Sequence, residues 1–222
     1  MISAREVAAR LDQATAKRRL LDHPFYEAWA EGSLTMTDLQ HYSTQYWRQV
    51  EAFPEHLRSV AATLPPSTPR RIVESNLRDE VEGDHAGLWL KFAEAVGVNS
   101  AEVMATPAEA ETARAINAFA TATQRSPQYA LGMIYGYESQ TPEVAQTKVA
   151  GLKSHYGIDG EGVDYFELHE RVDVEHSAEL AEAIALMSDD GITEAEAGAT
   201  AGAEAMWLLL DGVERVRQNS PS

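Results

Sequence analysis

The segment Tyr165-Phe-Glu-Leu-His169-Glu-Arg-Val-Asp173-Val-Glu-His176 has the repeat of an α-helix with one polar face. Successive residues of a helix are rotated by about 100°, so positions i, i+4 and i+7 share a face, and His169, Asp173 and His176 have that spacing. Two imidazoles and one carboxylate on an inward face form a ligand set for Fe, Mn or Zn, and such sets recur in di-iron helical bundles. A solvated polar stripe is the alternative. We interpret the three side chains as metal ligands because all three occupy one stripe.

Helical periods extend outward from this segment over almost the whole chain, and no stretch has the pattern of a strand. Several predicted helices begin with a capping residue, a capping box or a proline. These start signals are Ser3 to Glu6, Thr35 or Thr37, Pro127 and Thr193 to Glu196. The predicted helices cover about 4–22, 24–32, 38–64, 70–81, 85–96, 107–124, 127–138, a continuation to 156, 165–187 and 193–217. We therefore predict an all-α bundle of about seven or eight helices in one domain, residues 1–217, followed by a polar tail, 218–222.

Charge and composition exclude several classes of protein. Against 18 Lys and Arg the chain has 35 Asp and Glu, a formal charge of −17. A surface this acidic repels nucleic acids and anionic membranes, so we expect neither as a partner. The charged N-terminal residues do not form a secretory signal, and the chain has no cysteine. We therefore expect a cytoplasmic enzyme whose metal chemistry uses histidine and carboxylate ligands.

A dinuclear centre needs carboxylates from other helices, and two segments supply candidates. Glu138 follows an apolar, aromatic run and is either a cap near Pro142 or an inward ligand. His85 begins an amphipathic helix and is a third candidate imidazole. Glu82 and His85 share a face on an unbroken helix, whereas Glu80 and His85 share one if the helix deforms between them.

Aromatic residues and one lysine are concentrated around these candidates. Tyrosine is easily oxidised near a high-valent metal, so the tyrosines are compatible with radical or oxygenase chemistry, although buried tyrosines most often serve packing. The residues in question include Tyr26, Tyr42 and Lys148.

In order along the chain, these motifs resemble the haem-oxygenase-like di-metal oxidases, and within them the subgroup of the Chlamydia protein associating with death domains. More distantly the chain resembles the TenA and pyrroloquinoline-quinone biosynthesis proteins. The motifs that carry the resemblance span nearly the whole sequence: His23-Pro-Phe-Tyr26-Glu-Ala-Trp29, Leu39-Gln-His-Tyr42, Ala52-Phe-Pro54, Asn76-Leu-Arg-Asp-Glu80, His85-Ala-Gly-Leu-Trp89, Tyr137-Glu138-Ser-Gln, Lys148-Val-Ala-Gly-Leu152 and His169-x3-Asp173-x2-His176.

The resemblance implies a haem-oxygenase-like fold without haem that holds an Fe/Fe or Fe/Mn pair. The implied ligands are Glu80, His85, Glu138, His169, Asp173 and His176. Members of this subgroup make para-aminobenzoate for folate biosynthesis by sacrificing their own side chains, and they consume dioxygen and an external reductant. By position, Tyr26 resembles the excised tyrosine, Lys148 the amino donor and Tyr42 a redox-active tyrosine.

The sequence departs from the family at one point, because Glu80 and His85 are two residues closer together than their counterparts. Glu82 is therefore an alternative first ligand. Relatives also suggest a homodimer that receives electrons from an external donor. Two other functions remain open, a multi-turnover di-iron oxidase acting on a free amino acid or fatty acid, and a metal-free enzyme like TenA.

Overall fold

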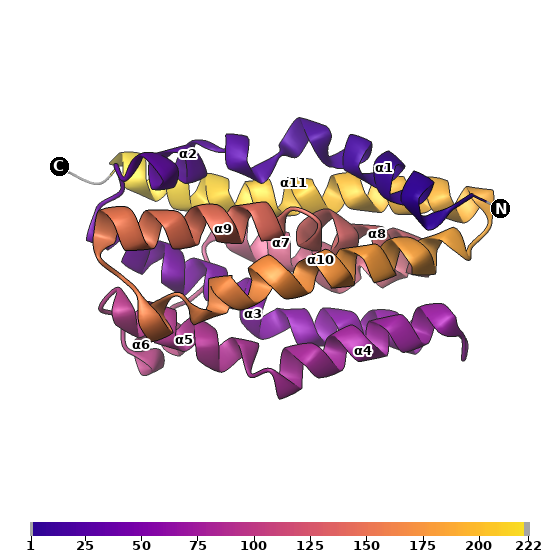
Figure 1. Cartoon of the computed structure of the whole chain (residues 1–222), viewed down its shortest axis with the longest axis horizontal. Coiled ribbons are helices and arrows are strands. Elements are labelled where there is room, and N and C mark those ends of the chain that lie inside the picture. Colours follow the sequence, from indigo (N-terminus) through magenta and orange to yellow (C-terminus); the bar gives the residue numbers. More distant parts are fainter. Residues whose placement is uncertain (1, 220–222) are drawn as a thin grey trace.

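The computed structural model describes residues 2–219, and the chain forms eleven α-helices with no strand over that range (Figure 1). The α-helices are α1 (Ala4–Thr15), α2 (Pro24–Glu31), α3 (Met36–Thr63), α4 (Thr68–Glu82), α5 (His85–Ala95), α6 (Ser100–Ala105), α7 (Ala110–Thr121), α8 (Pro127–Glu138), α9 (Thr141–Gly151), α10 (Asp164–Ala185) and α11 (Asp189–Asn219). A π-helical segment, η4 (Leu152–Tyr156), extends α9. The all-α prediction is confirmed. The predicted count of seven or eight is too low because short helices and breaks divide the bundle further.

Local signals in the sequence explain most helix starts. Ser3 and Glu6 form the predicted capping box of α1, and Thr35 with Asp38 forms one for α3. Ser126 caps α8, with Pro127 in its first turn. Pro54 lies inside α3, which continues without interruption to Thr63.

Several predicted boundaries are wrong. The first helix, expected to extend to Asp22, ends at Thr15 and is followed by two short 3-10 turns, Ala16–Arg18 and Leu20–Asp22. The helix expected from Pro107 begins at Ala110, because Gln45 of α3 binds the preceding loop through the Pro107 carbonyl and the Glu109 N–H. Asn99 caps a short helix, α6, that the sequence did not indicate.

At the C-terminal end, α11 starts at Asp189, so the predicted turn at 189–191 is helical and the Thr193 capping box lies inside the helix. The same helix continues through Gln218 and Asn219, which we had assigned to the polar tail. The rest of that tail, 220–222, lies outside the described residues.

Glycines let α8 and α11 approach closely. A Cβ on Gly132 or Gly136 of α8 would lie 2.0 or 2.3 Å from a carbonyl oxygen of α11. Gly198 and Gly202 of α11 face carbonyls of α8 in the same way, at 2.0 and 2.3 Å. Only glycine fits such spacing, so these four positions fix the backbone of α8 against the longest helix of the bundle.

The helices form two groups with the candidate site between them. In Figure 1, α3, α4 and α5 lie along the lower side, and α8, α9, α10 and α11 lie above them. Helix α10 packs against both α4 and α8. Within the described residues, none of the helices has the length and apolar character needed to cross a membrane.

Candidate metal centre

Six buried side chains that the sequence singled out come together as two triads. The first triad is Glu80 of α4, His85 of α5 and His169 of α10, and the second is Glu138 of α8 with Asp173 and His176 of α10. Within each triad, one potential ligand atom per residue lies within 4.8 Å of the others. One inward face of α10 thus contributes to both triads.

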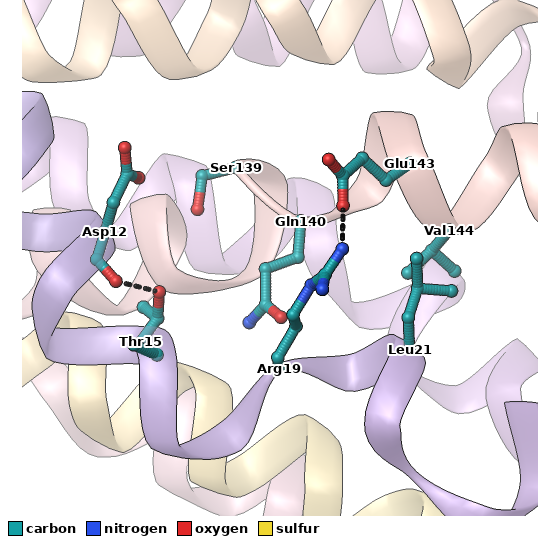
Figure 2. Close-up of a pocket in the computed structure, with 9 residues that line it drawn as sticks. Asp12, Thr15, Arg19, Leu21, Ser139, Gln140, Glu143 and Val144 are labelled. Carbon is teal, nitrogen blue, oxygen red and sulfur yellow. Dashed lines mark hydrogen bonds and ion pairs between the residues drawn. The ribbon is translucent and has the colours of Figure 1, made fainter. Parts of the chain in front are cut away.

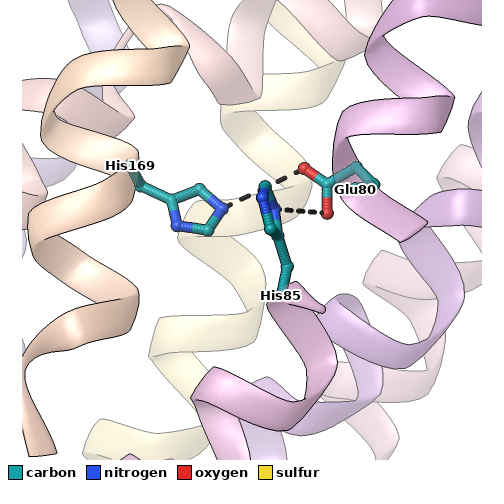
Figure 3. A group of neighbouring side chains, drawn as sticks. All are labelled: Glu80, His85 and His169. Atoms are coloured by element: carbon teal, nitrogen blue, oxygen red, sulfur yellow. Dashed lines mark ion pairs between the residues drawn. The ribbon is translucent and has the colours of Figure 1, made fainter. Parts of the chain in front are cut away.

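In the first triad, the Glu80 carboxylate lies beside two imidazoles (Figure 3). The Glu80 Oε2 atom is 2.9 Å from His85 Nδ1, and Oε1 is 4.0 Å from His169 Nε2. His169 donates its Nδ1 proton to the Tyr165 carbonyl at 2.7 Å. That bond leaves the Nε2 lone pair of His169 free to bind a cation beside Glu80.

A break between α4 and α5 brings Glu80 and His85 together. Helix α4 ends at Glu82, and Asp84 has a left-handed backbone conformation (φ 50°) while its side chain caps α5 at the Gly87 N–H. His85 is therefore the first residue of a new helix and points back toward Glu80. The chain thus deforms between Glu80 and His85, and this allows the two residues, five positions apart, to share a face. Glu82 lies exposed at the end of α4, outside the triad.

In the second triad, Glu138 is held by a neighbouring amide. Asn76 of α4 donates to Glu138 Oε1 at 2.8 Å, and His176 Nδ1 lies 3.5 Å from Asp173 Oδ1. Burial, and after it the charge of Asp173, raises the pKa of Glu138 well above its ordinary value. Burial disfavours the charged ring of His176, but the carboxylates around it prevail and raise its pKa to about 9.

Several buried ligand atoms make no hydrogen bond to the described residues, although each of the two imidazole nitrogens among them has a carboxylate beside it. His85 Nδ1, His176 Nδ1 and Glu138 Oε2 are buried and make no hydrogen bond to the described residues. Glu80, Glu138, His169 and Asp173, which come from both triads, also line one small cavity. Unpaired buried carboxylates and imidazoles are costly, and divalent cations with nitrogen and oxygen ligands would satisfy them. The donor set therefore fits two metal ions.

Lys148 and the tyrosines gather in a second buried cluster. Lys148 of α9 is 4% exposed, and its Nζ donates to the Tyr42 hydroxyl at 2.6 Å. The same Nζ lies 4.8 Å from the centre of the Tyr26 ring, and the Tyr26 and Tyr42 hydroxyls are 3.1 Å apart. Burial lowers the pKa of Lys148 well below its ordinary value, which favours the neutral amine. The three residues predicted to share a reaction thus touch one another.

A series of ring contacts, some stacked and some edge-on or tilted, connects this cluster with the first triad. Tyr165 stacks on His169 with ring centres 4.1 Å apart, and Trp89 lies 4.9 Å from Tyr165. Trp89 in turn stacks on Tyr46 at 4.9 Å, and Tyr46 lies 5.2 Å from Tyr42. The sequence analysis gave no role to Trp89. Its place one turn after His85, on the same face of α5, is the feature that could have shown it.

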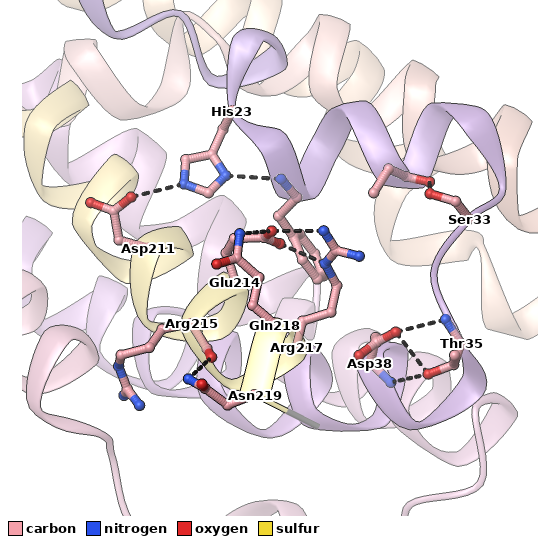
Figure 4. A network of polar contacts seen from close by, with 12 residues as sticks. His23, Ser33, Thr35, Asp38, Asp211, Glu214, Arg215, Arg217, Gln218 and Asn219 are labelled. Carbon is pink, nitrogen blue, oxygen red and sulfur yellow. Dashed lines mark hydrogen bonds and ion pairs between the residues drawn. The ribbon is translucent and has the colours of Figure 1, made fainter. Parts of the chain in front are cut away.

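The helix that carries Tyr26 is fixed by His23 (Figure 4). The Nδ1 atom of His23 accepts the Phe25 N–H as the cap of α2, and Nε2 donates to Asp211 of α11 at 3.2 Å. Burial lowers the pKa of His23, and Asp211 opposes that shift. The start of α2, and with it Tyr26, is thereby anchored to α11.

Two surface cavities have residues of α9 in their lining. One is lined by Tyr26 and Thr147, together with Leu21, Glu27, Ala30 and Glu31, so it reaches the ring that Lys148 contacts. The other lies where α1, α8 and α9 meet and is bordered by an ion pair of 2.9 Å between Arg19 and Glu143 (Figure 2). Of the two cavities, the first has a residue of the tyrosine cluster, Tyr26, in its lining.

The helical bundle and its buried carboxylate–histidine triads define a redox enzyme with a haem-oxygenase-like fold. The sequence profile of the family described as iron-containing redox enzymes matches residues 40–211, and the chain belongs to this family. A solved structure of a TenA homologue from Pseudomonas syringae has the same fold, with a TM-score of 0.79 and 18% identity over 95% of this chain and 92% of that one.

Curated relatives narrow the resemblance further. A protein of Nitrosomonas europaea named 4-aminobenzoate synthase is 34% identical over 219 residues, which cover 92% of this chain and 89% of the relative. A protein of the same name from Chlamydia muridarum is 35% identical over 185 residues, 82% of this chain and 78% of the relative. These relatives confirm the subgroup predicted from the motifs.

Proposed function

We propose that this enzyme is a di-metal oxygenase that makes 4-aminobenzoate (para-aminobenzoate) from its own Tyr26 and Lys148, with dioxygen and an external reductant. The observation that carries the proposal is the contact between the Lys148 amine and the Tyr26 ring, 4.8 Å apart, inside a buried aromatic cluster. Similarity to two proteins named 4-aminobenzoate synthase, at 34% and 35% identity, supports the product.

The six triad residues would hold the metal pair, as Fe/Fe or Fe/Mn, through three imidazoles and three carboxylates. Bound there, the metals would supply the oxidising chemistry with dioxygen. The three carboxylates leave two divalent ions with a net charge of about +1, so the protein compensates most of the ionic charge. Glu80, rather than the exposed Glu82, is the carboxylate that we assign to the first triad.

The protein's own residues prepare the reacting groups. Because burial lowers the pKa of Lys148, its nitrogen keeps a free lone pair, as an amino donor requires. The Tyr42 hydroxyl contacts both the Lys148 amine and the Tyr26 hydroxyl, so it fixes the position of the amine relative to the Tyr26 ring. Rings of Trp29, Tyr46 and Phe166 surround the amine and exclude water.

Intact mass and metal content, measured before and after exposure to oxygen and reductant, test the proposal. We expect two metal ions per chain, a mass loss that maps to Tyr26 and Lys148, and free 4-aminobenzoate. Tyr26→Phe and Lys148→Arg should each abolish the product, while two controls remote from the tyrosine cluster, Tyr135→Phe and Lys153→Arg, should retain it.

Other results would point to other functions. Metal uptake without mass loss, together with many turnovers of an added amino acid or fatty acid, would indicate an ordinary di-iron oxidase of the same fold. Protein that binds no metal under these conditions would contradict both oxidase functions and favour a metal-free enzyme.

A further inference from the structure

The histidines of the two triads are held by different partners. His169 gives its Nδ1 proton to a main-chain carbonyl of its own helix, that of Tyr165. His176 instead gives its Nε2 proton to a side chain of another helix, the carboxylate of Asp79 in α4, at 3.3 Å. His176 is buried, whereas the Asp79 side chain is 59% exposed.

This contact decides which nitrogen of His176 faces the centre. With Nε2 bound to Asp79, the Nδ1 atom points toward Asp173 Oδ1 at 3.5 Å and has no hydrogen-bond partner among the described residues. A carboxylate that accepts the distal N–H of an imidazole fixes the ring and its tautomer and makes the other nitrogen a better ligand.

We propose that Asp79 is a positioning residue for the second triad, holding His176 so that its Nδ1 binds one of the two metal ions. The inference rests on the proposed function in so far as that function requires metal in the triads. Asp79 is not a member of either triad. Its effect is therefore confined to the ion held by Glu138, Asp173 and His176.

Glu82 offers a matched control on the same helix. It is an exposed acidic residue three positions after Asp79, at the end of α4 and outside both triads. Removing either side chain changes the net charge by the same amount. Both positions are helical, where alanine is favourable, so Asp79→Ala and Glu82→Ala should both fold.

The test is a titration of chelator-treated protein with Mn²⁺, in which the electron paramagnetic resonance signal of free Mn²⁺ reports the unbound ion. We expect the wild type and Glu82→Ala to bind two ions with the same affinities. Asp79→Ala should bind the first ion normally and the second about 10- to 100-fold more weakly. Asp79→Asn should bind the second ion with an affinity between those of the wild type and Asp79→Ala, because its amide oxygen still accepts the N–H but has no charge.

Melting temperatures of the chelator-treated proteins should be alike, which separates positioning from loss of fold. Equal two-step binding by Asp79→Ala and Glu82→Ala would overturn the inference, and so would equal weakening of both ions in Asp79→Ala. Wild-type protein that takes up no Mn²⁺ would instead contradict the proposed metal centre itself, a result distinct from either of these.

Discussion

The Glu138 side chain is suited to bind a metal ion, but it destabilises the fold when no metal is bound. Its carboxylate is buried, one oxygen accepts from Asn76 and the other has no hydrogen-bond partner among the described residues. An unpaired buried polar atom costs about 1–3 kcal/mol, and the nearby Asp173 adds repulsion. A residue kept at such a cost without metal is better explained by a ligand role than by packing.

We therefore predict that Glu138→Gln stabilises the metal-free protein by about 1–3 kcal/mol, because the amide keeps the bond from Asn76 and replaces a carboxyl group whose charged form burial and Asp173 disfavour. Urea unfolding of chelator-treated protein measures the change, and metal should no longer stabilise the variant as it does the wild type. Glu143→Gln, at an exposed position, should change stability by less than about 0.5 kcal/mol. A metal-free Glu138→Gln protein less stable than the wild type would show that Glu138 serves packing.

His56 links stability to pH independently of the triads. It is buried on α3, its ring stacks on Phe119 of α7 at 5.6 Å, and burial lowers its pKa to about 4. The unfolded chain binds this proton near pH 6.5, so the contribution of neutral His56 is full above that pH and is lost as pH falls toward 4. The total loss is at most about 3 kcal/mol.

We predict that His56→Phe removes this part of the acid sensitivity while its ring keeps the stack on Phe119. The free energy of unfolding of the variant, minus that of the wild type, should rise by up to about 3 kcal/mol between pH 7.5 and pH 4. Taking this difference cancels the contributions of the other titrating groups to the pH dependence of stability. A difference that stays constant with pH would mean that folding does not shift the pKa of His56.

Single residues also mark how far the sequence could predict the site. The spacing of His169, Asp173 and His176 placed them on one face, because a regular helix fixes that geometry. Whether Glu80 or Glu82 lies beside His85 depends on the left-handed Asp84, a conformation that residues other than glycine rarely adopt. No periodicity reveals such a turn. Asn76 and Asp79 were missed because their roles depend on contacts between helices.

For whole helices, too, local sequence patterns were predictive and contacts between distant segments were not. Three helices with a capping box or a proline start, α1, α3 and α8, were predicted correctly at their first turn, whereas the capping box at Thr193 lies inside α11. The start of α7 was wrong because Gln45, more than 60 residues earlier, binds the loop in front of it. Tertiary contacts of that kind override local start signals.

At the scale of a helix pair, we predict that Gly136→Ala separates α8 from α11. The new Cβ would lie 2.3 Å from the Ala199 carbonyl oxygen, so the helices must move apart, at a cost of about 1–3 kcal/mol. Because Tyr137 and Glu138 follow directly on α8, the affinity of the second triad for metal should fall as well. Urea unfolding and Mn²⁺ titration measure the two effects.

Gly191→Ala in α11 is the matched control for this change. Its new Cβ would lie 3.2 Å from Gln128 Cγ and 3.3 Å from Met187 Cβ and would meet no backbone atom, so a shift of a few tenths of an ångström accommodates it. Replacing a helical glycine without a clash is neutral or stabilising by up to about 1 kcal/mol. Equal stability of the two variants would show that the close approach of α8 to α11 is not needed.

Across the whole molecule, the triads join the two groups of helices. Glu80 and His85 come from α4 and α5 in the lower group of Figure 1, and the other four residues come from α8 and α10 in the upper group. A bound metal pair would therefore hold the groups together, whereas α8 and α11 are already held by their glycine contacts. Metal that binds the folded chain stabilises it by mass action, and the gain falls on the elements that it connects.

We accordingly predict that removing metal with a chelator increases amide hydrogen exchange first in α4 and α5, around the Gly83–Asp84 break, and leaves α11 protected. Hydrogen exchange read by mass spectrometry, with and without chelator, measures this helix by helix. The Glu80→Gln variant, which has lost a ligand from the lower group, should show the exchange pattern of the chelated wild type even when metal is added. A uniform increase over all helices would mean that metal stabilises the bundle as one cooperative unit, and no increase in α4 and α5 would show that the triads do not join the two groups.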